Sequence, residues 1–170
     1  MLSSLLTVFV LLAAAAAPRI VDRILAVVDA RPILLSELRL AQQATGEAEA
    51  GAALEALIDE HLMFADASRL PQAALTDAEE EAAVSSLVAR LGSDDRDPDA
   101  VRRMARRQAT ILKYVDFRFR PQVRAATEDP EEKARLEAEE LDARIEAWVK
   151  DLRAAADVRY NAVSTAPATR

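Results

Sequence analysis

The stretch VDRILAVVDARPILLSELRL, residues 21–40, contains two short apolar runs separated by a turn signal, and it leads directly into a helical pattern. The two runs, 24–28 and 33–35, are β-branched and aliphatic, which favours two strands. Residues 29–32 supply an aspartate and a proline between them, so we expect an antiparallel hairpin that reverses there. Because an isolated two-stranded hairpin is only marginally stable in water, this one needs a packing partner elsewhere in the chain.

Helical periodicity dominates the rest of the sequence and predicts five helices. Capping signals mark three of the starts: Ser36 at the first helix, Thr76 with Glu79 as a capping box at the third, and Asp97 before Pro98 at the fourth. The predicted helices span residues 36–45, 54–70, 76–91, 98–119 and 131–156, with a linker over 47–53. Helix is therefore the main element expected of this chain.

The composition is that of one folded domain with a substantial core. The chain has 170 residues, of which 51% are hydrophobic and 30% charged, and its three glycines argue against a multi-stranded β architecture. Cysteine is absent, which excludes disulfides, thiol catalysis and cysteine-ligated metals. The formal net charge of −7 argues against nucleic acid as a general partner, because phosphate binding requires an excess of lysine and arginine.

The first seventeen residues, MLSSLLTVFVLLAAAAA, carry no charged side chain and end in a run of small residues. This pattern is typical of a secretory signal peptide with an apolar core at 5–12 and a cleavage site within 13–17. An uncleaved membrane anchor is the alternative, although a span of this length is at the lower limit for crossing a bilayer. We therefore expect export, with 18–161 as a single folded domain and 162–170 as a disordered tail.

The predicted fourth helix has an apolar side and a basic side. The apolar side comprises Val101, Met104, Ala105, Ile111, Leu112, Val115 and Phe119, and the basic side comprises Arg102, Arg103, Arg106, Arg107, Lys113 and Arg118. Residues 98–124 hold eight basic and two acidic side chains, whereas 128–142 hold eight acidic and two basic ones. A basic face alone would suggest nucleic acid or an anionic membrane. Because the next segment has the opposite charge, we expect the last helix to fold back and neutralise this face.

The last predicted helix carries the only tryptophan of the chain. Leu141, Ile145, Trp148 and Leu152 are spaced by four, three and four residues, which predicts a buried stripe. After this helix, residues 158–160 alternate between apolar and polar side chains as in a short strand. We expect that strand to be the third in the sheet begun by the hairpin, which would join the two ends of the mature chain.

Motifs of catalysis and cofactor binding are missing from the sequence. It has no glycine-rich phosphate loop, no GxSxG and no HExxH, and its only histidine, His61, lacks a second histidine or a cysteine with which to bind a metal. The acidic run 79–81 and the loop 93–99 lack the spacing of a calcium site and are interpreted as helix-capping segments. We therefore expect no enzyme, no cofactor and no metal, and we interpret His61 as a histidine at the edge of a packed helix.

Three segments, taken in order, resemble the N-terminal domain of SurA-type periplasmic chaperones. They are VDRILAVVDARPILLSEL (21–38), LEALIDEHLMFADASRL (54–70) and LTDAEEEAAVSSL (75–87). The closing segment WVKDLRAAADVRYN (148–161) is similar to the terminal helix and strand that such chains return to the N-terminal domain. Many relatives insert a parvulin-type prolyl isomerase domain before this helix, but here only residues 120–129 connect the two helices, too few for a domain.

Residues and resemblance together predict a mainly α fold: an irregular, orthogonal bundle of about five helices with a small N-terminal β-hairpin joined by a short C-terminal strand. The resemblance implies an ATP-independent periplasmic chaperone that binds unfolded or extended segments of outer-membrane proteins, without isomerase activity. Client contacts are expected from adaptable apolar side chains, and the candidates are Met63, Phe64, Met104, Tyr114, Phe117 and Phe119. The alternative is a non-catalytic adaptor or structural subunit of an envelope complex with one fixed partner. Neither alternative includes nucleic acid, and either would meet the membrane only through an uncleaved leader.

Overall fold

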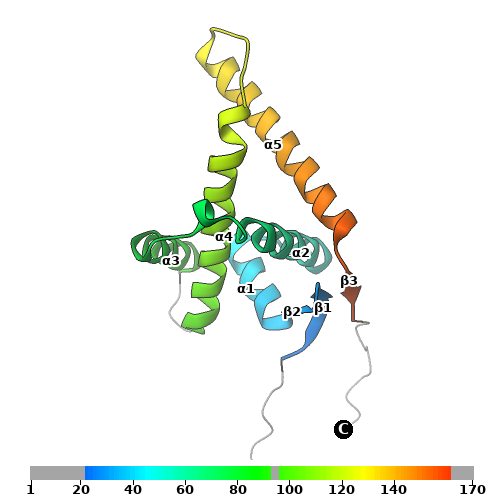
Figure 1. The fold of residues 1–170 in the computed structure, drawn as a ribbon. Helices are drawn as coiled ribbons and strands as arrows, with labels where there is room; N and C mark the ends of the chain where they lie inside the picture. Colours follow the sequence, from blue (N-terminus) through cyan, green and yellow to red (C-terminus); the bar gives the residue numbers. More distant parts are fainter. Residues whose placement is uncertain (1–21, 93–95, 162–170) are drawn as a thin grey trace, which may run out of the picture.

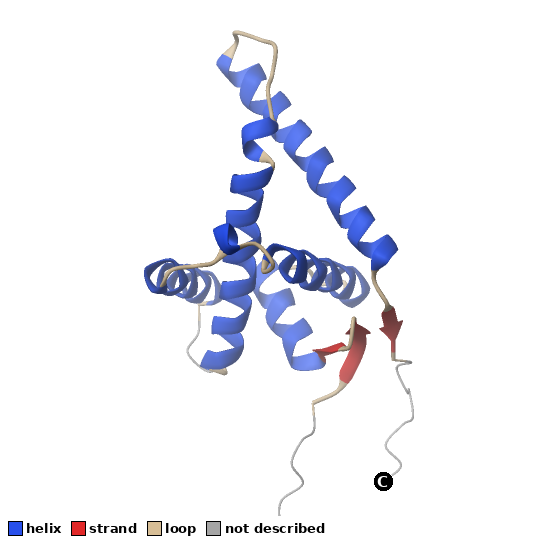
Figure 2. Cartoon of the chain, in the orientation of Figure 1, coloured by secondary structure: helices blue, strands red, loops and turns tan. Residues whose placement is uncertain are grey.

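The computed structural model describes residues 22–92 and 96–161, and the fold is mainly helical with a small antiparallel sheet (Figure 1, Figure 2). In chain order the elements are β1 (Ile24–Val28), β2 (Arg31–Leu34), α1 (Leu35–Thr45), α2 (Ala50–Ala67), η1 (Pro71–Ala73), α3 (Asp77–Leu91), α4 (Pro98–Arg118), η2 (Arg120–Gln122), α5 (Pro130–Ala155) and β3 (Val158–Tyr160). The predicted fold class is confirmed, because the described residues form five α-helices and one three-stranded sheet. The predicted leader 1–17 and tail 162–170 lie outside the described residues.

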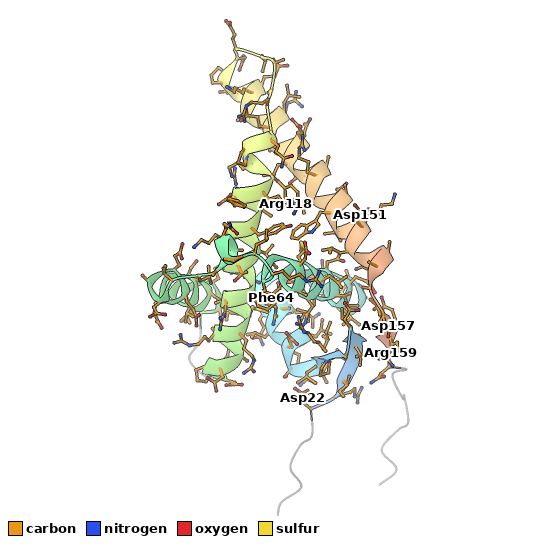
Figure 3. All side chains as sticks on the ribbon, in the orientation of Figure 1. Asp22, Phe64, Arg118, Asp151, Asp157 and Arg159 are labelled. Carbon is orange, nitrogen blue, oxygen red and sulfur yellow. The ribbon has the colours of Figure 1, made fainter. Side chains whose placement is uncertain are left out.

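The sheet joins the two ends of the described chain. β1 is its central strand, and β2 and β3 pair with β1 in antiparallel orientation on either side. Ala26 of β1 lies opposite Tyr160 of β3, and the backbone N–H of Asn161 donates to the carbonyl of Leu25 at 2.9 Å. Figure 3 shows Asp157 and Arg159 beside the N-terminal hairpin, although more than a hundred residues separate them in sequence. The predicted third strand is therefore confirmed.

The turn of the hairpin is tighter than the sequence indicates. Asp29 and Ala30 have positive φ angles of 45° and 69°, the left-handed conformation that two-residue hairpin turns require. The second strand consequently covers Arg31–Leu34 rather than 33–35, and Pro32 lies within it. A proline is tolerated there because β2 is an edge strand, where a missing N–H need not interrupt the ladder.

Most predicted helix boundaries are confirmed by the caps. The Thr76 hydroxyl accepts from the amide of Glu79 while the Glu79 side chain accepts from the amide of Thr76, which completes the capping box of α3. Asp97 caps α4 through the amide of Asp99. Gly46 ends α1 with a φ of 77°, a left-handed conformation in which a side chain would be strained.

Two predicted boundaries are wrong. The Ser36 hydroxyl donates to the Asp22 carboxylate instead of capping α1. The segment 47–53 is not a linker, because α2 already begins at Ala50. Its N-cap is Glu49, whose carboxylate accepts hydrogen bonds from the first amides of the helix. Glutamate is not among the residues that usually mark a helix start, so the sequence carried no strong signal here.

Three buried clusters hold the elements together. The sheet packs on α1 and α2, the second cluster joins α2, α4 and α5, and the third joins α1, α3 and α4. In Figure 1, α4 crosses α2 and α3 and extends beyond them, and α5 returns from its far end towards the sheet. We call the part formed by the sheet, α1, α2, α3 and the first half of α4 the body. Within the described ranges, the helices are all too short or too polar to cross a membrane.

Candidate functional site

Helix α5 is long and packs on the rest of the protein along one side only. Of its 26 residues, Trp148 alone is buried. The predicted stripe is correct in register, because Leu141, Ile145 and Leu152 pack partly buried against the same cluster as Trp148. The stripe continues into the first half of the helix, where Leu136 and Leu141 are partly buried. The opposite side of α5, which carries charged side chains and alanines, is exposed.

Three aromatic side chains fix α5 to the body, and we call them the aromatic joint: Tyr114, Phe119 and Trp148. The Tyr114 and Trp148 rings stack with centroids 4.8 Å apart, and Phe119 meets the Trp148 ring at 60° and 5.5 Å. Oδ2 of Asp66 on α2 accepts hydrogen bonds from Tyr114 Oη at 3.1 Å and from Trp148 Nε1 at 3.0 Å. Burial, together with the charge of Asp66, raises the pKa of Tyr114. The polar tip of each ring is thus satisfied, so the joint combines packing with directional contacts.

Four of the six predicted client-contact residues lie in or against this joint: Tyr114, Phe119, Met63 and Phe64. Tyr114 and Phe119 are buried in it, and Met63 and Phe64 cover it while remaining partly accessible. Met104 is buried in the separate cluster between α1, α3 and α4. Among the six, Phe117 alone is exposed, with 54% of its surface accessible. The structure therefore places these residues in three different environments rather than on one surface.

Apolar surface is exposed where α4 extends beyond the body. Leu112, predicted in the buried stripe of α4, is 63% exposed, so this part of the prediction is wrong. Farther along, a hollow of about 340 Å³ lies between η2 and the first half of α5. Its lining comprises Arg120, Val123, Arg124, Ala134, Glu137, Ala138 and Leu141. We call residues 112–141, with this hollow, the arm.

The arm hollow combines an apolar floor with a charged rim. Val123, Ala138 and Leu141 supply carbon surface, and Arg120 and Arg124 place guanidinium groups beside it. Such a mixture of apolar and polar groups is typical of surfaces that bind another protein chain. The arm is therefore the candidate functional site of this protein.

The basic side of α4 is neutralised by α3 rather than by α5. Glu79 Oε2 lies 2.8 Å from Lys113 Nζ, and Glu80 binds Arg102 at 3.1 Å and Arg106 at 3.8 Å. The hydrogen bond from Lys113 lowers the pKa of Glu79 to about 2. Among the described residues no ion pair joins α4 to α5, so the predicted neutralisation by the last helix is wrong.

Arg107, predicted on the exposed side of α4, is buried between three helices. Its Nη1 forms an ion pair with Glu37 on α1 at 2.7 Å, and its Nε donates to Glu60 on α2 at 2.7 Å. His61 Nε2 lies 2.9 Å from the same oxygen of Glu37. Burial disfavours ionisation of Glu37, but the hydrogen bond to His61 and the charge of Arg107 outweigh it and keep its pKa below the ordinary value. Sequence reasoning missed this network, because its members are far apart in the chain.

No family model matches the chain, and no curated protein was found to match it. The function of the arm is therefore inferred from its geometry alone. That geometry has three parts. Two buried clusters close the body, a third cluster around the aromatic joint packs α5 on α2 and α4, and the arm exposes Leu112 and Phe117. Arg118, labelled in Figure 3, lies within the arm, with its guanidinium carbon 5.6 Å from the centre of the Tyr114 ring.

Proposed function

We propose that this protein is an ATP-independent, chaperone-like module of the periplasm that binds unfolded or extended segments of envelope proteins, outer-membrane proteins among them. The observation that carries the proposal is the apolar surface exposed in the arm: Leu112 and Phe117 of α4 and the apolar part of the hollow beside α5. Exposed apolar surface is typical of a site that binds another protein chain. The resemblance of residues 21–38, 54–70 and 75–87 to the N-terminal domain of SurA-type chaperones, and of 148–161 to their terminal helix and strand, supports the same function. The proposal assigns no catalytic step to the chain.

The arm suits weak and reversible binding. Leu112 and Phe117 are single exposed side chains, and the hollow beside η2 is partly open to solvent. Burial of apolar surface contributes about 25 cal/mol per Å². The few apolar groups of the arm should therefore bind an extended segment with modest affinity. A chaperone that releases clients without nucleotide requires such modest affinity, because no other energy source opens the complex.

A second candidate function is a non-catalytic adaptor or structural subunit that holds one fixed partner in an envelope complex. The observation that favours it is the fixed geometry of the aromatic joint, where Asp66 accepts from both Tyr114 and Trp148 and sets the course of α5. Purification from cells with an affinity tag distinguishes the two. One partner in stoichiometric amount supports the adaptor, whereas a mixture of envelope proteins supports the chaperone.

A double variant, Leu112→Ser with Phe117→Ser, is expected to lose most of its ability to suppress aggregation of a denatured porin. The two substitutions remove the exposed apolar side chains of α4 that belong to the arm. Because both side chains are more than half exposed, we expect the free energy of unfolding to change by no more than about 0.5 kcal/mol per substitution. Light scattering after dilution of the denatured porin measures the suppression.

The matched control is Val88→Ser on α3, an exposed apolar side chain outside the arm. This variant should suppress aggregation as well as the unmodified protein does. Equal loss of activity in V88S and in the double variant would show that the arm is not the binding surface. Failure of the unmodified protein to slow aggregation or to bind porin peptides would contradict the chaperone function itself.

A further inference from the structure

A groove lined by arginines lies on the body, and it shares no lining residue with the arm hollow. It consists of two adjoining hollows of about 310 and 240 Å³ between α1 and the first half of α4. The two hollows have Ser36, Leu40, Ala100 and Arg103 in common, so they form one continuous groove, which we call the basic groove.

The charge of the basic groove is opposite to that of the chain. Its charged lining comprises Arg39, Arg96, Arg103, Arg107, Glu37 and Asp97. Arginines therefore outnumber carboxylates on its walls, whereas the whole sequence has 29 acidic and 22 basic residues. A concave surface whose charge opposes that of the remaining protein attracts ligands that the remaining protein repels.

Two arginines of the groove keep donors available for a ligand. Arg39 is exposed and forms no hydrogen bond or salt bridge with the described residues. The closest oxygen of Asp97 is 3.7 Å from Arg103 Nη2, and both side chains are largely exposed, so this pair is weak. Guanidinium groups bind carboxylates through two parallel hydrogen bonds, a geometry that neither arginine uses within the described chain.

A buried donor in the wall of the same groove also lacks a partner. The Arg107 side chain is 8% exposed and lines the larger hollow. Its Nε donates to Glu60 and its Nη1 forms an ion pair with Glu37, but Nη2 has no hydrogen-bond partner and is the only such buried side-chain atom in the described residues. A buried N–H without an acceptor is unfavourable, so the wall of the groove contains one donor for which the protein supplies no acceptor.

The remaining lining favours a peptide over a nucleic acid. Pro32, Leu34 and Ala100 contribute exposed or partly exposed carbon atoms to the lining. No Phe, Tyr or Trp is present there to stack on a base, and the His61 ring is already bonded to Glu37. A peptide in which carboxylates alternate with aliphatic side chains matches both the arginines and the apolar lining. We propose that the basic groove binds acidic peptide segments, with Arg39 and Arg103 as the carboxylate-binding residues. This site is independent of the arm, so each proposal can fail without the other.

Fluorescence anisotropy of a labelled short peptide in which glutamate alternates with leucine tests the proposal on the full chain. The peptide should bind, and added salt should weaken binding because exposed charges are screened. In the double variant Arg39→Gln with Arg103→Gln, Kd is expected to rise at least about tenfold, since two charge-assisted contacts are lost. The matched control is Arg135→Gln, which removes an exposed arginine of α5 outside the groove and should leave Kd unchanged.

Two further probes decide between ligand classes. A peptide with glutamine at every glutamate position should bind at least about tenfold more weakly, and labelled oligothymidylate should bind more weakly than the acidic peptide. The proposal is overturned by absence of binding, by equal affinity for the glutamine peptide or for oligothymidylate, or by full affinity in the double variant. Far-ultraviolet circular dichroism of each variant confirms that a lost affinity is not a lost fold.

Discussion

Replacing Trp148 with alanine is expected to lower the free energy of unfolding by about 3–5 kcal/mol. Leu152 and the ion pairs of Arg153 with Glu55 and Asp59 should still hold the C-terminal half of α5. Trp148 is the only buried residue of α5, and its ring stacks on Tyr114. The substitution removes that stacking, leaves a cavity between α2, α4 and α5, and withdraws one of the two donors to Asp66. Urea denaturation followed by circular dichroism measures the loss.

Trp148→Phe is the matched control for this substitution. Phenylalanine retains an aromatic ring against Tyr114 but cannot donate to Asp66, so the expected loss is smaller, about 1–3 kcal/mol. An alanine variant as stable as the unmodified protein would contradict the role of the aromatic joint. A phenylalanine variant as unstable as the alanine variant would show that the hydrogen bond, and not packing, dominates.

Ending the chain after Ala156 is expected to lower the melting temperature by roughly 5–15 °C, because the sheet loses β3. The truncation removes the ladder between β3 and β1 and two further contacts, from the amide of Asp157 to Asp29 Oδ1 and from the Asn161 side chain to the carbonyl of Ile24. It also removes the hydrogen bond from Tyr160 Oη to Glu55 at 2.8 Å. The hairpin that remains is a two-stranded sheet, which is marginal on its own.

The comparison chain for this truncation ends after Asn161, so the two proteins differ only in residues that form β3 and its flanking contacts. Calorimetry of both chains gives the difference directly. Equal melting temperatures would show that joining the two ends contributes nothing to stability. A large difference would confirm that β3 and the N-terminal hairpin form one cooperative unit.

Local signals were sufficient for most of the fold. The capping box at Thr76 and Glu79 and the cap at Asp97 act within one helical turn, so the residues that specify the boundary are also the residues that form it. The alternation at 158–160 predicted β3 for the same reason, because a two-residue period is a local property. The hairpin turn was predicted over residues 29–32 but is formed by Asp29 and Ala30 alone. No sequence pattern indicates an alanine at positive φ.

The sequence of α4 does not predict which of its side chains the neighbouring helices cover. Periodicity indicates which residues share a face, but it does not show how far neighbouring helices extend along that face. Leu112 belongs to the apolar stripe and is nevertheless 63% exposed, although Ile111 and Tyr114 beside it are buried. Arg107 lies on the basic side and is buried, because Glu37 and Glu60 approach it from α1 and α2.

The candidate site was predictable only in part. Of the six client-contact candidates, Phe117 alone is exposed, whereas Tyr114 and Phe119 belong to the aromatic joint. The role of Asp66 had no signal in sequence, because its two donors come from α4 and α5 and meet only in the folded chain. Opposite charge on neighbouring segments did not predict pairing, since exposed ion pairs contribute too little to direct how helices pack.

Site-specific photo-cross-linking to an unfolded porin tests the proposed function most directly. A photoreactive benzophenone amino acid is placed singly at Phe117 and at Ala138 in the arm, and at Val88 on α3 as the control. The proposal predicts strong cross-links to the porin from Phe117 and Ala138 and weak or absent ones from Val88. Cross-links of equal strength from all three positions, or from Val88 alone, would contradict the assignment of client binding to the arm.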